Sequence, residues 1–156
     1  MKVRFIILLF VLTSGVLLAQ DTDKIKDLAP FVGHWIGTST GFKDSKITRS
    51  EPAFEKIAMG LDGNILEIDL YSESLRLHTI IYYNAEEDIY KYNPFYKKGS
   101  ASYPAKFENG KLVVTPTPEK RFIFEIMRDG RFREYGEQKK NGVWEKYFED
   151  IFTRVD

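Results

Sequence analysis

The sequence predicts an all-β fold, a closed up-and-down antiparallel β-barrel of about ten strands with a short N-terminal helix. Tight-turn pairs recur at short spacing, at Asp62-Gly63, Asn109-Gly110, Asp129-Gly130 and Asn141-Gly142, and such pairs reach the positive φ that hairpins require. The runs between them are rich in Tyr, Phe, Ile, Val and Thr, which suit a pleated, half-buried surface. Closure removes the two open edges of such a meander, and the chain has no long connection for a Greek-key sandwich.

The elements follow in order along the chain. A short helix is expected over residues 24–29, with Asp23 as its N-terminal cap and Pro30 as its stop. Pro52, in the second expected strand, predicts a bulge or bend. The expected strands cover residues 33–41, 46–58, 62–71, 75–84, 88–95, 101–107, 110–116, 120–128, 131–139 and 142–154.

Residues 1–19 have the pattern of a secretory signal peptide, with two basic residues, an apolar run and a small-residue end. The apolar stretch Phe5–Ala19 is shorter than the ~20 residues of a spanning helix. We expect cleavage after Ala19 or Gln20, which leaves a single barrel domain over residues 20–156. The protein is then exported, periplasmic or secreted, and has no membrane insertion after signal removal. An uncleaved membrane anchor is the alternative.

Composition excludes several classes of function. The 23 basic and 23 acidic side chains give zero net charge, which argues against a nucleic-acid partner. The absence of cysteine excludes disulfides, thiolate catalysis and zinc–thiolate sites. Aromatic residues make up 15% of the chain, and this fraction is the unusual one.

Strand alternation places much of this aromatic content on one face. We expect a cavity lined by Leu77, Thr79, Ile81, Tyr83, Tyr90, Tyr92, Phe122, Phe124 and Phe132, with Leu66, Ile68 and Leu70 on the same interior surface. Such a lining suits a small hydrophobic or amphipathic ligand. The alternative is that these side chains simply fill the barrel, as is normal for small barrels.

The stretch from Leu28 to Ser39 contains Gly33-His34-Trp35, a Gly-x-Trp motif at the entry to the first strand, and Arg154 lies in the last strand. This pattern resembles the lipocalin-like (calycin) β-barrels, nearest to secreted bacterial lipocalin-like domains of unknown function and more distantly to nitrobindins. The resemblance implies that Arg154 packs across Trp35 and closes one end of the barrel.

The resemblance to nitrobindins raises the question of haem. Nitrobindins ligate the iron through a His in the last strand, whereas residues 142–154 contain none. Tyr147 could only substitute as a ligand of different chemistry, so we expect no cofactor. His34 and His78 are expected to face outward, and no metal site is predicted.

Three acidic residues near the C-terminus could face the interior, namely Glu134, Glu149 and Asp150. An unpaired buried charge is costly, so any interior carboxylate needs a partner. Arg133 and Arg154 are the candidate partners, and spacing does not choose between them.

The function predicted from these observations is binding of a small hydrophobic or amphipathic ligand in an aromatic-lined cavity. One alternative is a barrel enzyme, either haem-binding in the manner of nitrobindin or using a buried Glu, Asp or Tyr. A second alternative is a structural or interaction barrel with a filled interior. No catalytic residue is predicted, an enzyme is less expected than a binder, and the oligomeric state stays open.

Overall fold

The computed structural model describes residues 22–156, so the expected signal peptide, 1–19, lies outside the described residues. The chain enters the fold through helix α1 (Thr22–Lys26) and a 3-10 turn, η1 (Ala29–Phe31). The short N-terminal helix expected from the sequence is confirmed, but its bounds differ from 24–29: α1 ends at Lys26 rather than at Pro30, and Asp23 lies within it rather than capping it. Pro30 lies in the first turn of η1, where its missing N–H has no intrahelical partner to lose. No helix in residues 22–156 has the length and apolar character to span a membrane.

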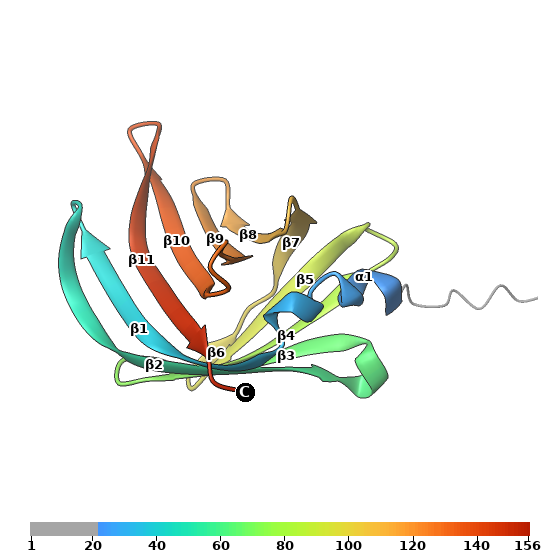
Figure 1. The fold of residues 1–156 in the computed structure, drawn as a ribbon. Helices are drawn as coiled ribbons and strands as arrows, with labels where there is room; N and C mark the ends of the chain where they lie inside the picture. The colour runs from blue at the N-terminus through green and yellow to red at the C-terminus, as the bar shows by residue number, and fades with distance from the viewer. Residues whose placement is uncertain (1–21) are drawn as a thin grey trace, which may run out of the picture.

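The strands form a closed antiparallel barrel, as the sequence predicts (Figure 1). They are β1 (Gly33–Lys43), β2 (Lys46–Gly60), β3 (Ile65–Ser72), β4 (Arg76–Asn84), β5 (Ile89–Tyr96), β6 (Gly99–Ser100), β7 (Tyr103–Glu108), β8 (Lys111–Thr117), β9 (Lys120–Ile126), β10 (Phe132–Lys140) and β11 (Val143–Arg154). Strands β1 to β5 pair in chain order, and so do strands β7 to β11. β5 pairs with β7, and β11 pairs with β1, which closes the ring. The two-residue β6 pairs with the end of β5, so the ring itself has the ten strands expected.

The two Asn-Gly pairs adopt the positive φ angles expected of tight hairpin turns. Asn109 has φ 54° and Gly110 has φ 75°, and Asn141 and Gly142 have φ 50° and 83°. These left-handed conformations cost Asn and Gly less than other residues. Of the bulge or bend predicted at Pro52, the bulge is wrong, because the β1–β2 register shifts between Gly41 and Phe42, and Pro52 pairs in register with Thr38.

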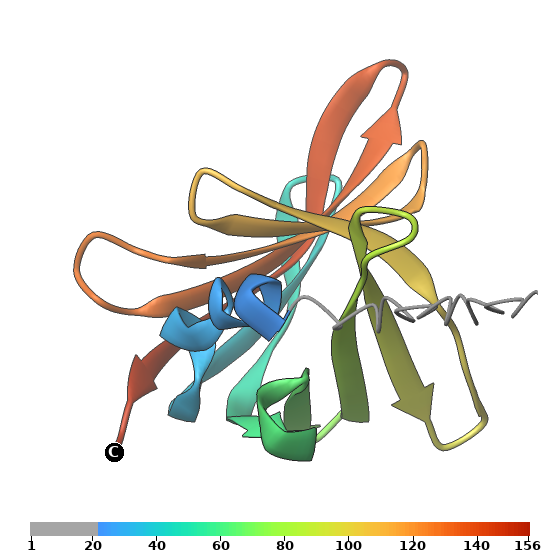
Figure 2. The ribbon, with the colours of Figure 1, turned by 90° about the vertical axis from the view of Figure 1, so that its right-hand side faces the viewer.

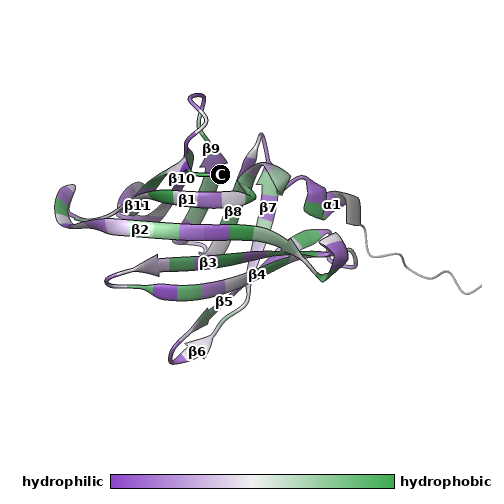
Figure 3. Ribbon diagram, turned by 60° about the horizontal axis from the view of Figure 1, so that its bottom comes forward, coloured by the Kyte–Doolittle hydropathy of each residue, from purple (hydrophilic) through white to green (hydrophobic). Residues whose placement is uncertain are grey.

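Alternation along the strands separates an interior from an exterior. Figure 3 shows apolar and polar residues alternating along β2 and β3. In β3, Leu66, Ile68 and Leu70 are buried, as expected, whereas Glu67 and Asp69 between them are half-buried. Successive side chains of a strand point to opposite faces, so each strand contributes every second residue to the barrel interior.

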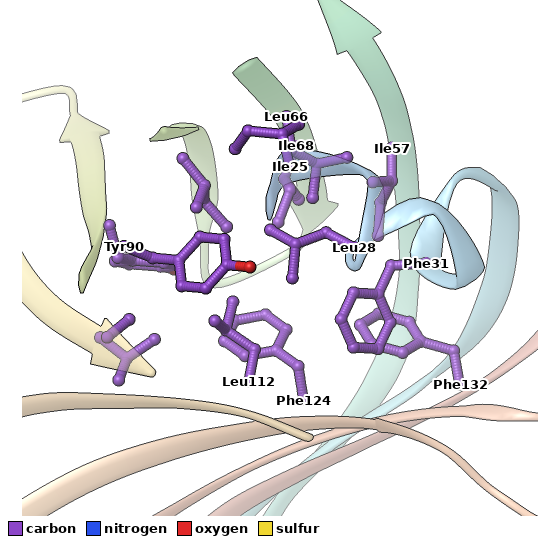
Figure 4. Packing of buried hydrophobic residues seen from close by; sticks show 14 of the residues in the cluster. Ile25, Leu28, Phe31, Ile57, Leu66, Ile68, Tyr90, Leu112, Phe124 and Phe132 are labelled. Atoms are coloured by element: carbon purple, nitrogen blue, oxygen red, sulfur yellow. The ribbon is translucent and has the colours of Figure 1, made fainter. Parts of the chain in front are cut away.

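The N-terminal segment fills one end of this interior. Ile25, Leu28 and Phe31 are all 2% exposed or less, and Figure 4 shows them between the walls of the barrel. The Phe31 ring centroid lies 5.6 Å from that of Phe132. The Tyr90 hydroxyl donates to the Lys24 carbonyl at 2.6 Å. Burying each such apolar side chain is worth about 1.5–3 kcal/mol, so α1 and η1 stabilise the barrel and occupy its end (Figure 2).

Candidate ligand-binding site

The α1 end of the barrel is sealed by Trp35 and Arg154, which face each other across β1 and β11. The Arg154 guanidinium carbon lies 4.4 Å from the centroid of the Trp35 ring, and its Nη2 donates to the Pro30 carbonyl at 3.1 Å. The Trp35 indole N–H donates to the Phe31 carbonyl at 2.8 Å. Gly33 has φ 151°, and a Cβ there would lie 2.8 Å from the Arg154 guanidinium, so a glycine is needed beside this contact.

A cavity of about 310 Å³ opens at the other end of the barrel. Figure 1 shows the β1–β2 and β10–β11 hairpins extending toward this end, away from α1. The side chains that line the cavity come from seven strands and the β3–β4 turn: Ser39, Arg49, Leu75, Leu77, Tyr92, Tyr96, Lys120, Phe122, Glu134, Tyr147, Phe148 and Asp150. The interior is therefore filled at the α1 end and hollow at the other.

Three carboxyl groups meet in the interior, from Glu55 on β2, Glu134 on β10 and Asp150 on β11. We call them the acidic cluster. They are 0%, 7% and 4% exposed, respectively. Asp150 is the register partner of Glu134 on one side and of Ser39 on the other, and Glu134 and Asp150 line the cavity.

Residue spacing alone does not decide whether Glu134 and Asp150 face the interior, and no motif in the sequence marks Glu55. A signal for Glu55 exists, because the two-residue period of β2 places it on the same face as Ala53 and Ile57, both buried. Glu149, the third acidic candidate, lies on the exterior, where the Arg133 guanidinium contacts it at 2.5 Å and contacts Glu125 at 3.0 Å.

The acidic cluster has few protein donors. Within residues 22–156, neither oxygen of Glu55 nor Oδ1 of Asp150 has a hydrogen-bond donor as partner. The Ser39 hydroxyl and the Thr40 backbone N–H donate to the Asp150 carboxylate. The remaining contact is between the carboxyls of Glu134 and Glu55, which form a hydrogen bond only when one of them is protonated. Arg133 and Arg154, the partners considered from sequence, both bind elsewhere.

Burial accordingly changes the proton affinity of the acidic cluster. Burial and the nearby Asp150 charge raise the pKa of Glu55 to about 8. Burial and the charge of Glu55 hold the pKa of Glu134 well above its usual range. Burial raises the pKa of Asp150 to about 6, and the Ser39 hydrogen bond opposes that rise. Burial thus favours the protonated forms of Glu55 and Glu134, and Asp150 is the member of the cluster whose ionised form the Ser39 hydrogen bond supports.

The cations near the cavity mouth already have partners. Arg49 Nη1 lies 3.4 Å from Glu51 Oε1, and the Arg49 guanidinium also donates to the Ser39 and Ser74 hydroxyls. The Lys120 ammonium lies 4.8 Å from the Tyr147 ring centroid. Arg49 is thus paired with a carboxylate, whereas Lys120 contacts aromatic rings.

Aromatic rings form the cavity walls above the acidic cluster. The Phe122 ring centroid lies 6.2 Å from that of Tyr92 and 6.1 Å from that of Phe148. A Cβ at Gly136 would lie 2.2 Å from the Phe148 ring. The absence of a side chain at Gly136 therefore leaves room for the Phe148 and Tyr147 rings beside β10.

The cavity candidates from the sequence divide between the two ends of the interior. Leu77, Tyr92 and Phe122 line the cavity, and the Thr79 hydroxyl donates to the Tyr92 hydroxyl at 3.5 Å. The others pack in the core beside α1 and η1: Ile81, Tyr83, Tyr90, Phe124 and Phe132. Strand alternation correctly assigns these residues to the interior. It does not show where each lies along the barrel axis, between the α1 end and the open end.

The side chains present are a poor fit for haem iron. His34 contacts Asp156 at 3.0 Å and His78 contacts Asp69 at 2.8 Å, both on the exterior. Tyr147 lines the cavity, but burial and the Glu134 charge raise its pKa, which disfavours the tyrosinate that ligates iron. Among residues 22–156 no group of three His, Asp or Glu side chains is arranged to hold a metal ion.

Comparison with known proteins identifies the fold. No family model matches the chain, and no curated protein matches it. Among solved structures it is similar to the zebrafish ileal bile acid-binding protein complexed with cholic acid, with a TM-score of 0.56 at 12% identity over 81% of this chain and 99% of that one. It is also similar to Rv2717c from M. tuberculosis, with a TM-score of 0.59 at 9% identity over 85% and 97% of the chains. The fold is thus the calycin-like barrel.

Proposed function

We propose that this protein binds a small hydrophobic or amphipathic molecule in the cavity at the open end of its barrel. The observation that carries the proposal is the division of the interior, in which α1 and η1 fill one end and a cavity of about 310 Å³ with aromatic walls remains at the other. That volume is near the lower limit for ligand pockets, about 300–1,000 Å³, which favours a compact ligand.

The likeness to a bile acid-binding protein of zebrafish supports a barrel of the ligand-binding type. The Leu75 and Tyr96 side chains, 37% and 41% exposed, add an apolar rim to the cavity. Contact with an apolar rim removes part of a hydrophobic molecule's surface from water, which favours its entry into the cavity.

The test is a binding titration with the neutral hydrophobic dye Nile red. Leu77→Trp fills the cavity, whereas Arg76→Trp adds the same ring at the exposed neighbouring position on the outer face. We expect dye binding in the wild type and in R76W and its loss in L77W, with both variants folded by circular dichroism. Equal dye binding by L77W and R76W would show that the dye does not occupy the cavity and would overturn the proposal.

We also propose that the mature protein acts outside the cytoplasm and carries no haem. The signal-peptide pattern of residues 1–19 supports export, and the outward histidines support the absence of haem. Addition of haemin to the purified protein tests the second point, because a ligated iron would produce a sharp Soret band.

Acid–base catalysis is a second candidate function, favoured by one observation. Glu134 lines the cavity, and burial and Glu55 raise its pKa, which favours the protonated form that a general acid needs. Native mass spectrometry identifies any copurified molecule, and incubation with it then tests conversion. Glu134→Gln would keep binding and lose conversion if the protein is an enzyme, whereas a molecule returned unchanged would contradict catalysis.

A further inference from the structure

We propose that the ligand carries a positively charged amine, and that the cavity holds this ammonium group between Glu134 and Asp150 and against the aromatic walls. The inference rests on the proposed function and adds the chemical class of the ligand.

The unpaired Asp150 oxygen is the first observation. Asp150 is 4% exposed and lines the cavity, yet its Oδ1 has no donor among residues 22–156. A buried acceptor without a donor destabilises the protein, and it does so more when it is charged. The Asp150 carboxylate is therefore a position where a ligand N–H gains most, and a charged N–H gains more than a neutral one.

Glu134 extends this acceptor surface. It is the direct register partner of Asp150, so the two carboxyls lie side by side at the bottom of the cavity. Glu55, fully buried beside them, does not line the cavity, and its carboxyl contacts that of Glu134. An ammonium group has three donors to distribute among such acceptors.

The walls are the second observation. Phe122, Tyr147 and Phe148 surround the space above the carboxyls, and the negative face of an aromatic ring attracts cations. Lys120 already places its ammonium 4.8 Å from the Tyr147 ring centroid.

A ligand with a negatively charged carboxylate fits this cavity less well than an amine. A carboxylate at the bottom of the cavity would meet Asp150 and the acceptor oxygens of Glu134. Arg49 is the cation nearest to this level by register, and it is held by Glu51, Ser39 and Ser74. A carboxylate would have to compete with Glu51 for the Arg49 guanidinium.

Binding of a cation has a measurable consequence for protons. The titratable and charged groups that face the site are Glu51, Glu55, Arg49, Tyr92, Tyr96, Lys120, Glu134, Tyr147 and Asp150. Burial favours the protonated forms of Glu55 and Glu134, and an ammonium group beside them favours the ionised form. Amine binding therefore releases protons into the buffer.

The test uses three probes with one aromatic ring system: naphthylmethylamine, naphthylmethanol and naphthoate. Calorimetric titration of the full mature protein, in two buffers of different ionisation enthalpy, gives affinity and proton release together. We expect the amine to bind about tenfold to a hundredfold more tightly than the alcohol, the carboxylate to bind most weakly, and protons to be released with the amine alone.

Asp150→Asn is expected to remove the preference for the amine and keep alcohol binding. Glu145→Gln, a half-exposed position on the same strand, is the control and keeps the preference. Equal binding of amine and alcohol, or tighter binding of naphthoate, would overturn the amine inference and leave the ligand-binding barrel standing. Binding of none of the three probes would count against the proposed function itself.

Discussion

Arg154 stacks on Trp35 with its guanidinium carbon 4.4 Å from the ring centroid, and this contact joins the last strand of the barrel to the first. The same guanidinium donates to the Pro30 carbonyl, so one side chain ties the ring closure to the segment that fills the barrel end. The contact is thus structural, and it lies at the end opposite the cavity.

Removing this contact is expected to destabilise the fold without changing ligand binding. Arg154→Met keeps the apolar stem and loses the cation and its donors, for a predicted loss of about 1–3 kcal/mol in the free energy of unfolding. Denaturant titration measures the change, and Arg128→Met, at an exposed turn position, is the control. A loss in R154M no larger than in R128M would contradict the structural role.

The acidic cluster predicts that stability falls as pH rises. Burial lifts the pKa of Glu55 from 4.5 in the unfolded chain to about 8 in the folded protein, so the folded state binds the proton more tightly. Its contribution to stability is complete below pH 4.5 and is lost progressively as the pH rises to about 8. Each such group contributes a slope of about 1.4 kcal/mol per pH unit within that window.

Glu55→Gln tests this linkage. The amide cannot ionise, so we expect a flatter pH profile of the free energy of unfolding than in the wild type, and higher stability than the wild type at alkaline pH. Glu73→Gln, at an exposed position of the β3–β4 turn, should follow the wild type. Parallel profiles for the wild type and E55Q would contradict the assignment of a proton to Glu55.

A side chain at position 136 is expected to displace the Phe148 ring in the cavity wall. Gly136→Ala would place a methyl group 2.2 Å from the Phe148 ring, which forces the ring to move, and overpacking of this kind costs about 1–3 kcal/mol. We expect weaker Nile red binding and lower stability. Gly41→Ala is the matched control, because its Cβ would meet its nearest neighbour at 3.4 Å, an ordinary contact. Equal effects of the two substitutions would argue against the role of Gly136.

Export predicts the mass of the mature chain. Expression of the full chain in a bacterial host should yield a protein that begins at Gln20 or Asp21, recovered outside the cytoplasm. Intact-mass measurement of the purified protein gives the start to the residue. A chain that retains residues 1–19 would instead favour the membrane anchor.

The sequence by itself determined the strands, the hairpins and the inward face of each strand. These features are local: Asn-Gly pairs adopt left-handed turns, and a strand turns successive residues to opposite faces. Leu66, Ile81 and Phe132 were placed inside on this basis, and all three are buried.

Only the tertiary structure decided what meets inside the barrel. Period-two alternation shows which face of the strand a side chain is on but not its position along the barrel axis. It therefore could not separate Phe132, which packs in the filled end, from Phe122, which lines the cavity. The acidic cluster needs ring closure, because β11 pairs with both β10 and β1 and so brings Glu134 and Asp150 to the side of the barrel where β2 carries Glu55. Long-range pairing of this kind depends on the whole fold, and it is what turns separate carboxylates into a site.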